Sequence, residues 1–357
     1  MSKFRTAGIL GLALSLCGAR ADLRATPQAD SPAFEGKTTA KDAAALEEGL
    51  RTKPDNQAAR ENLIDYYFQE TIRSRTSEPE EKREKHVFWL IEHHPGSEFA
   101  GSPEAGILPM GFTGSIEGYQ RGKQLWLEAV DQHPGDAAVL RNAAQFLNLF
   151  EAKVARNLLE KALALEPNDA QASSMLAQSY EHERMLAGSP DEKEALSRKA
   201  VSVRERGLEG ADAEQRFYEL GDLATSTYEA GDTVKAQQYA FELLASADGF
   251  KKNWNYGNAV HKANIILGRV ALGRGDITGA KEYLLAAGQT PGSPQLNSFG
   301  PNMVLAKELL EKGEREVVLA YLDSCAKFWK MGGDQLQSWM ATIKGGGVPE
   351  FGGNLLY

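Results

Sequence analysis

The chain has 357 residues, of which 42% are hydrophobic and 25% are charged, and its net charge is −9. This length accommodates two ordinary domains or one long array of repeats, and the hydrophobic fraction is enough for a buried core. An acidic surface repels phosphate backbones, so the charge argues against a nucleic-acid partner. The stretches between turns are rich in Ala and poor in Val and Ile, which favours helix over sheet.

The first 21 residues have the features of a secretory signal peptide. Lys3 and Arg5 precede an apolar run over residues 7–16, and residues 19–21 (Ala-Arg-Ala) offer the small-x-small pattern of a cleavage site. The run is too short to span a bilayer, so we expect no transmembrane segment. We therefore predict cleavage after Ala21 and export to the periplasm or the exterior.

Cleavage would change both the charge and the cysteine content. It would remove three basic residues and no acidic one, leaving 37 basic against 49 acidic residues and a net charge of −12. Leu16 is bulky where a lipoprotein signal carries a small residue, which argues against lipidation of Cys17. Only Cys325 would remain, so no intramolecular disulfide is possible, and we expect this thiol to be buried and inert.

The mature chain begins with a polar segment, residues 22–41, which is broken by proline and has no apolar period. We predict that it is a flexible leader. A helical pattern starts at Asp42 and continues, with turns, to about residue 330. Beyond it, residues 331–357 predict a short helix near 335–343 and a glycine-rich tail that should be mobile.

The largest interruption of the helical pattern is the segment 96–118, which holds six glycines, Pro103 and Pro109. A structureless loop this long inside a compact array is uncommon and is often functional. A solvent-exposed insertion at a repeat junction is an equally good interpretation.

One spacing recurs along the chain: a small residue, an apolar residue four positions later, and a small residue three positions after that. The copies, some of them degenerate, are Gly122-Trp126-Ala129, Ala155-Leu159-Ala162, Ala236-Ala240-Leu243, Ala280-Leu284-Ala287 and Val318-Leu322-Cys325. In the last three, a Leu-small pair lies about twelve residues upstream, and a turn dipeptide follows that pair: Gly231-Asp232, Gly275-Asp276 and Gly313-Glu314. This pattern predicts helix, tight turn and helix, repeated, with small side chains where helices approach closely.

These residues resemble the tetratricopeptide-repeat family, whose unit is a pair of helices. Gly122, Trp126, Ala129 and Pro134 match the second helix and closing proline of the unit, and Ala155, Leu159, Ala162 and Pro167 match them again 33 residues later. The first helix is matched by Leu63 and Tyr67, by Leu176, Ala177 and Tyr180, and by Leu267 and Gly268. The resemblance covers most of residues 42–330 in about seven degenerate copies. It implies an all-α fold, a right-handed superhelix of helical hairpins.

The family binds protein partners in a concave groove lined by the first helix of each pair. The groove positions that carry over to this sequence are Gln171, Ser174, Gln178, Tyr218, Thr225, Tyr228, Lys262, Arg269 and Lys307. Their polar and aromatic mixture suits recognition of a protein segment or peptide. The resemblance therefore implies a scaffold that needs no cofactor.

No motif for catalysis or metal binding stands out. His182-Glu183 suggests a zinc protease helix, but the second histidine would fall at Leu186. His93 and His94 are adjacent, so on a helix they point about 100° apart. We therefore predict a non-enzyme without a metal.

One patch offers a different function. Residues 253–258 (Asn-Trp-Asn-Tyr-Gly-Asn) are followed by His261, and Trp254, Asn258 and His261 are its candidate binding residues. Amides and aromatic rings at the start of a helix suit a carbohydrate or peptide, although packing between hairpins explains them at least as well. The alternative hypothesis is therefore an envelope glycan- or solute-binding protein, or an enzyme, that uses this patch or the 96–118 loop.

Overall fold

The structure is a computed structural model that describes residues 38–111 and 114–356. Within these residues it contains sixteen α-helices, a few short 3₁₀ turns and no β-strand, so the all-α prediction is confirmed. The predicted signal peptide and most of the predicted leader lie outside the described residues. No helix in the described ranges is long and apolar enough to cross a bilayer.

The chain divides into two compact units, one up to Pro167 and one from Asn168. In the first unit, α3 packs along α4, α6 packs along α7, and α5 contacts both α4 and α6. Its core includes Leu63, Leu90 and Trp126, none of which is measurably exposed. The helices of this unit are α2 (Ala40–Thr52), α3 (Gln57–Ser74), α4 (Ser77–His93), α5 (Ile116–Gln132), α6 (Ala137–Leu147) and α7 (Ala152–Leu165).

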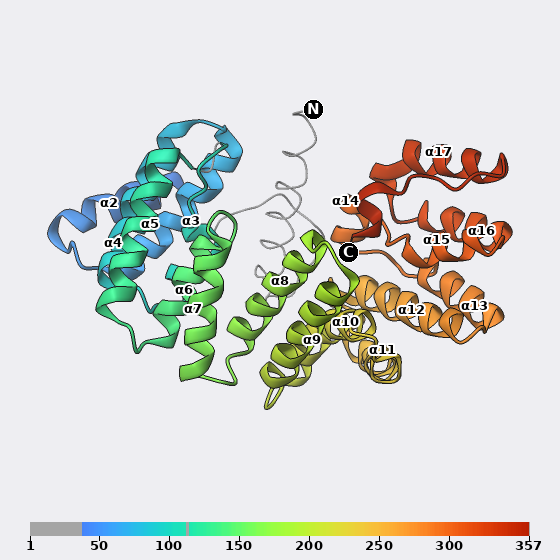
Figure 1. The fold of residues 1–357 in the computed structure, drawn as a ribbon. Coiled ribbons are helices and arrows are strands. Elements are labelled where there is room, and N and C mark those ends of the chain that lie inside the picture. The colour runs from blue at the N-terminus through green and yellow to red at the C-terminus, as the bar shows by residue number, and fades with distance from the viewer. Residues whose placement is uncertain (1–37, 112–113, 357) are drawn as a thin grey trace. The chain divides into compact units, whose positions relative to one another are not determined.

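The second unit is built from four helical hairpins, α8/α9, α10/α11, α12/α13 and α15/α16, which are labelled in Figure 1. A short helix, α14, precedes the last hairpin, and α17 packs on α16. The helices are α8 (Ala170–Leu186), α9 (Pro190–Gly207), α10 (Ala213–Glu229), α11 (Thr233–Ala247), α12 (Tyr256–Gly273), α13 (Ile277–Gly288), α14 (Pro294–Phe299), α15 (Val304–Glu311), α16 (Arg315–Cys325) and α17 (Gly333–Lys344).

The turns inside the hairpins follow from the dipeptides noted in the sequence. Gly231, Gly275 and Gly313 have φ of 86°, 81° and 87°, a left-handed conformation that glycine adopts without steric cost. Asp232 and Asp276 then cap the next helix by accepting a backbone N–H bond. Three hairpins of the second unit therefore turn in the same way.

The recurring small–large–small spacing lies on the buried face of the helices. Ala155, Leu159 and Ala162 have no measurable exposure, and neither do Ala280, Leu284 and Ala287. Small side chains at these positions let neighbouring helices approach, and the leucines fill the space between them.

The segment after α4 differs from a solvent-exposed insertion. It forms two 3₁₀ turns, η1 (Phe99–Gly101) and η2 (Pro103–Ala105), and it buries Phe99, Ala105 and Ile107. These three buried apolar side chains, together with short-range backbone hydrogen bonds, fold part of this glycine-rich stretch onto the first unit.

The C-terminal tail also differs from the prediction of mobility. Residues 348–355 pack back onto the second unit, where Phe351 is completely buried and Asn354 is 6% exposed. The connection between α13 and α15 contains the short helix α14.

Candidate functional site

The first helices of the four hairpins in the second unit, α8, α10, α12 and α15, carry a linked series of ion pairs. Arg184 on α8 pairs with Glu229 on α10. Glu229 Oε1 lies 2.7 Å from Nη1 of Arg269 on α12, whose Nε lies 3.0 Å from Oε1 of Glu308 on α15. We call these four residues the charge ladder, and the surface that they share the first-helix face.

Arg269 is the centre of the charge ladder. Its side chain is 14% exposed, and its guanidinium carbon lies 4.2 Å from the ring centroid of Tyr228. Burial alone would lower the pKa of Arg269, but Glu308 and Glu229 raise it above its ordinary value. The group is therefore a fixed cation between two carboxylates and an aromatic ring.

The two carboxylates of the charge ladder respond in opposite directions. Burial raises the pKa of Glu308, and the nearby Glu229 and Glu311 add to this effect. Burial would also raise the pKa of Glu229, but Arg269 and Arg184 bind it and lower the pKa below its ordinary value. Glu308 is thus the carboxylate that the ladder compensates least.

A second cluster surrounds Arg204 of α9, whose side chain is completely buried. The guanidinium donates to Glu181 at 3.0–3.1 Å, pairs with Glu219, and lies 3.6 Å from Asp222. Asp222 also pairs with Lys262 of α12. This Arg204 cluster ties α8, α9, α10 and α12 together.

An aromatic pair joins α10 to the turn that precedes α12. The rings of Tyr218 and Trp254 are 6.0 Å apart, and Asn253 Nδ2 donates to the Tyr218 hydroxyl at 2.7 Å. The indole Nε1 of Trp254 is buried and has no hydrogen-bond partner.

The other two residues of the predicted patch lie apart from this pair. Asn258 is held inside the protein, where its Nδ2 donates to Asn255 and to Gln295. His261 is 4% exposed and contacts Tyr321 in the core. The structure therefore does not gather Trp254, Asn258 and His261 around one point.

The remaining predicted groove residues make local contacts. Ser174 and Gln178 of α8 share a weak hydrogen bond of 3.4 Å, and the Thr225 hydroxyl donates to the Gly221 carbonyl one helical turn earlier. Gln171 is half-buried at the start of α8. Lys307 is 44% exposed and lies 4.0 Å from Glu311.

The sequence predicts Arg269 and Lys262 as groove residues but does not by itself indicate the acidic residues that bind them. Glu229 lies 40 residues before Arg269, and Glu308 lies 39 residues after it. Glu229 directly follows the groove candidate Tyr228, and Glu308 directly follows the groove candidate Lys307. A search for acidic residues next to the groove candidates on the neighbouring first helices would therefore have found both.

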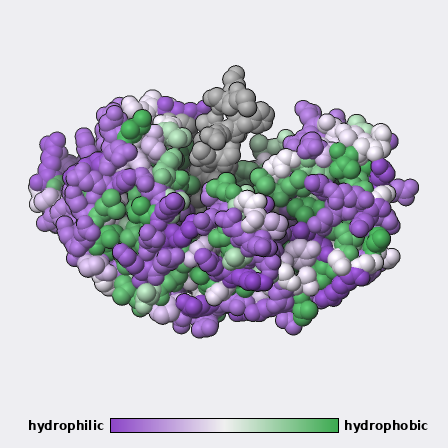
Figure 2. All heavy atoms as spheres, in the orientation of Figure 1, coloured by the Kyte–Doolittle hydropathy of each residue, from purple (hydrophilic) through white to green (hydrophobic). Residues whose placement is uncertain are grey.

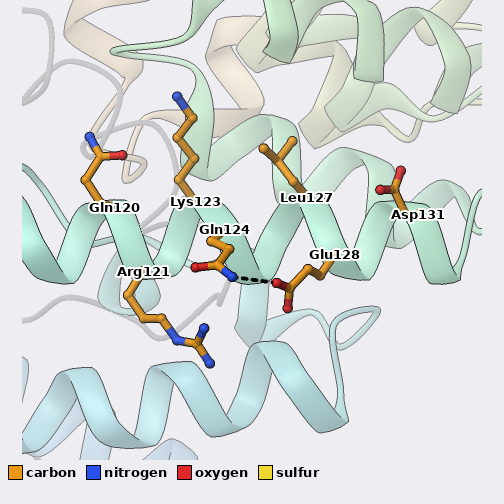
Figure 3. Close-up of a pocket in the computed structure, with 7 residues that line it drawn as sticks. All are labelled: Gln120, Arg121, Lys123, Gln124, Leu127, Glu128 and Asp131. Atoms are coloured by element: carbon orange, nitrogen blue, oxygen red, sulfur yellow. Dashed lines mark hydrogen bonds between the residues drawn. The ribbon is translucent and has the colours of Figure 1, made fainter.

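The rest of the described surface offers less. In the described ranges, no three His, Cys, Asp or Glu side chains are grouped as metal ligands would be. Hydrophobic residues on the face shown in Figure 2 occur in separate groups among hydrophilic ones. A shallow hollow runs along α5 (Figure 3), but its Arg121, Lys123 and Gln124 side chains already bind neighbouring glutamates. It is lined by Gln120, Arg121, Lys123, Gln124, Leu127, Glu128 and Asp131.

Comparison with known proteins gives no family. No protein-family model matches the chain, and a search of the curated proteins found no match.

Proposed function

We propose that this protein is an exported, non-catalytic scaffold of the tetratricopeptide-repeat type, which binds a segment of a partner protein on the first-helix face of its second unit. The observation that carries the proposal is the charge ladder. It places half-buried carboxylates, a guanidinium and a tyrosine ring from successive first helices on one surface.

The ladder suits a peptide because its side chains are already ordered. Each charged group is held by at least one neighbour, so binding would immobilise few additional side chains. An extended peptide offers backbone N–H and C=O groups, and the ladder offers carboxylate acceptors and guanidinium donors for them. The rings of Tyr228 and Tyr218 add apolar contact area at low entropic cost.

Two further features agree with a repeat architecture. Three hairpins of the second unit turn through a glycine at the same place, as repeated units do. The last helix, α17, buries Leu336, Trp339 and Ile343 and exposes a polar outer face, as the terminal helix of a repeat array does.

A selected peptide tests the proposal. Peptides that bind the purified protein would be isolated from a random library, and their affinity would be measured by fluorescence anisotropy. Arg269→Ala should weaken binding at least about tenfold, since a central arginine that contacts the ligand is a typical hot spot.

Lys235→Ala provides the matched control. Lys235 on α11 pairs with Glu205 and lies 5.9 Å from the ring centroid of Tyr239. It is therefore a cation beside a carboxylate and a tyrosine ring, as Arg269 is, but it lies on a second helix of a hairpin and not on a first helix. This variant should bind the peptide as the wild type does. Equal losses in the two variants, or no loss in Arg269→Ala, would contradict the proposal.

The second candidate function is glycan or solute binding at Tyr218 and Trp254, and the unpartnered indole N–H of Trp254 favours it. A thermal-shift screen with cell-wall sugars tests this idea, because a ligand that binds the native state raises its stability by mass action. A sugar that stabilises the wild type and Arg269→Ala, but not Trp254→Phe, would support this function over peptide binding.

A further inference from the structure

The C-terminal tail is bound to the second unit in the way that a short peptide is bound to a receptor. Phe351 has no exposed surface, and its ring meets the Trp339 ring edge-on, with 5.0 Å between centroids and 75° between planes. Pro349 is also buried, whereas the neighbouring residues Val348, Glu350, Gly352 and Gly353 are exposed. Only a few side chains therefore hold the tail.

Asn354 supplies the polar half of this contact. Its Nδ2 donates to the carbonyl oxygens of Phe299 at 3.0 Å and Pro301 at 2.9 Å, and its backbone carbonyl accepts from the Met303 N–H at 2.8 Å. These three groups belong to the backbone from the last residue of α14 to the residue before α15. Asn354 therefore binds this connection through both its side-chain amide and its backbone carbonyl.

Gly300 makes this close approach possible. Its φ is 88°, and a Cβ built on it would lie 2.5 Å from Cε2 of Trp329 and 2.8 Å from Nδ2 of Asn354. The backbone therefore passes between the indole and the amide with no room for a side chain. We call Phe299–Met303, Trp329 and Trp339 the tail cradle.

The tail leaves one group of the tail cradle unsatisfied. Trp329 is 4% exposed, and its Nε1, which is bonded to Cε2, is buried without a hydrogen-bond partner. A buried donor without an acceptor is destabilising, so the chain's own tail is an incomplete ligand. A segment that also offered an acceptor here would bind better.

The link between the tail and α17 contains Gly345, Gly346 and Gly347 and no helical continuation. Gly346 has φ of 87° and ends α17. A glycine-rich link allows the tail to leave the cradle without unfolding α17, because the helix ends before the link.

We propose that the tail cradle is a peptide-binding site for an extended segment in which Phe is followed three residues later by Asn, and that residues 348–355 are a displaceable occupant of it. The partner would be a protein that presents such a segment. The covalently attached tail competes at a high effective concentration, so the free cradle should bind peptide much better than the occupied one. This inference does not depend on the first-helix face.

The test uses the full-length protein with a protease site inserted between Gly347 and Val348, cleaved after folding. The probe is a fluorescein-labelled peptide of residues 348–356 (VPEFGGNLL). We expect saturable binding to the cleaved protein, and at least tenfold weaker binding to the uncleaved protein. Peptides with Ala in place of Phe351 or of Asn354 should also bind at least tenfold more weakly.

A second variant covers the case in which cleavage disturbs the fold. Uncleaved Asn354→Ala keeps the chain intact but weakens the tail, so it should bind the peptide more tightly than the wild type does. Arg269→Ala should bind it as the wild type does. The proposal is overturned if folded Asn354→Ala gains no affinity, if the cleaved protein stays folded without binding, or if cleavage unfolds the second unit, which would make the tail part of its core.

Discussion

Arg204 and Glu181 form a two-point ion pair in which Nη2 lies 3.0 Å from Oε2 and Nε lies 3.1 Å from Oε1. The arginine side chain is completely buried, whereas the glutamate is 29% exposed. One guanidinium thus compensates Glu181, Glu219 and Asp222 at once. Removing it would leave three carboxylates close together with only Lys262 to offset them.

Arg204→Met should therefore destabilise the protein by about 3–5 kcal/mol at neutral pH, because it leaves partly buried carboxylates without their counter-ion. Urea unfolding followed by circular dichroism at neutral pH measures this. Arg206→Met, an exposed position on the same helix, is the control and should change stability by at most about 0.5 kcal/mol. A loss in Arg204→Met no larger than that in the control would contradict the prediction.

His261 should make stability depend on pH. Its Nε2 lies 2.9 Å from the Tyr321 hydroxyl, and because that hydroxyl donates to the Asn302 carbonyl at 3.0 Å, Nε2 carries a proton and donates to the hydroxyl. Burial, and to a smaller extent Lys262, lowers the pKa of His261 from 6.5 to about 3. Between these values the unfolded chain binds a proton that the folded chain does not, so stability falls as pH falls.

The slope from this one group approaches about 1.4 kcal/mol per pH unit once the pH is well below 6.5. We expect the difference in unfolding free energy between wild type and His261→Gln to shrink or reverse from pH 7 to pH 4. Burial also lowers the pKa of the other buried histidine, His86. Because His86 is present in both proteins, its contribution cancels in the difference between their unfolding free energies. Parallel stability curves for the two proteins would contradict this prediction.

Gly268 is required where α12 meets α15. A Cβ at this position would lie 2.3 Å from Cδ2 of Leu305, which has no exposed surface, and 3.2 Å from Cβ of Tyr283. Gly268→Ala should therefore cost about 1–3 kcal/mol through overpacking, less about 1 kcal/mol gained in helix propensity. At Gly273, on the same helix, nothing lies within 4 Å, and Gly273→Ala should be neutral or slightly stabilising. A Tm that falls in the first variant and not in the second would confirm the prediction.

These residues also show what the sequence can and cannot predict. Gly268 belongs to a Leu-Gly pair that recurs at a fixed distance from a turn glycine, so its place at a helix contact follows from local spacing. Helix starts follow from capping residues such as Asp136, Asp169 and Ser189, each of which accepts a backbone N–H bond. Local chemistry therefore predicts the helices and their turns.

The contacts that cross the hairpins were not predictable in the same way. The partners of Arg269 lie about 40 residues away on both sides, so the repeat indicates which helices carry them, but the pairing itself depends on how those helices pack. The tail has the composition of a flexible segment, yet buried Pro349, Phe351 and Asn354 hold it on the second unit. Each of these contacts depends on where the hairpins place distant side chains, which a single sequence does not specify.

The segment 99–107 provides the last prediction, because one side chain holds it to α4. Arg83 has no exposed surface, and its guanidinium binds Glu80 while also donating to the carbonyl oxygens of Glu104 and Gly106. Neither carbonyl oxygen accepts a hydrogen bond within a regular helix. Both would therefore lose their link to α4 together with Arg83. Arg83→Met should therefore free this segment, with Glu80 left as a buried carboxylate without its counter-ion.

We expect Arg83→Met to lower stability by about 3–5 kcal/mol and to raise amide hydrogen exchange first at residues 100–106. Lys82→Met is the control, since Lys82 pairs with Glu78 at the surface, where such pairs contribute well under 1 kcal/mol. Exchange that rises equally over α3 and α4 would mean that Arg83 supports the whole unit. Exchange confined to residues 100–106 would mean that this segment opens separately from the helices once Arg83 is lost.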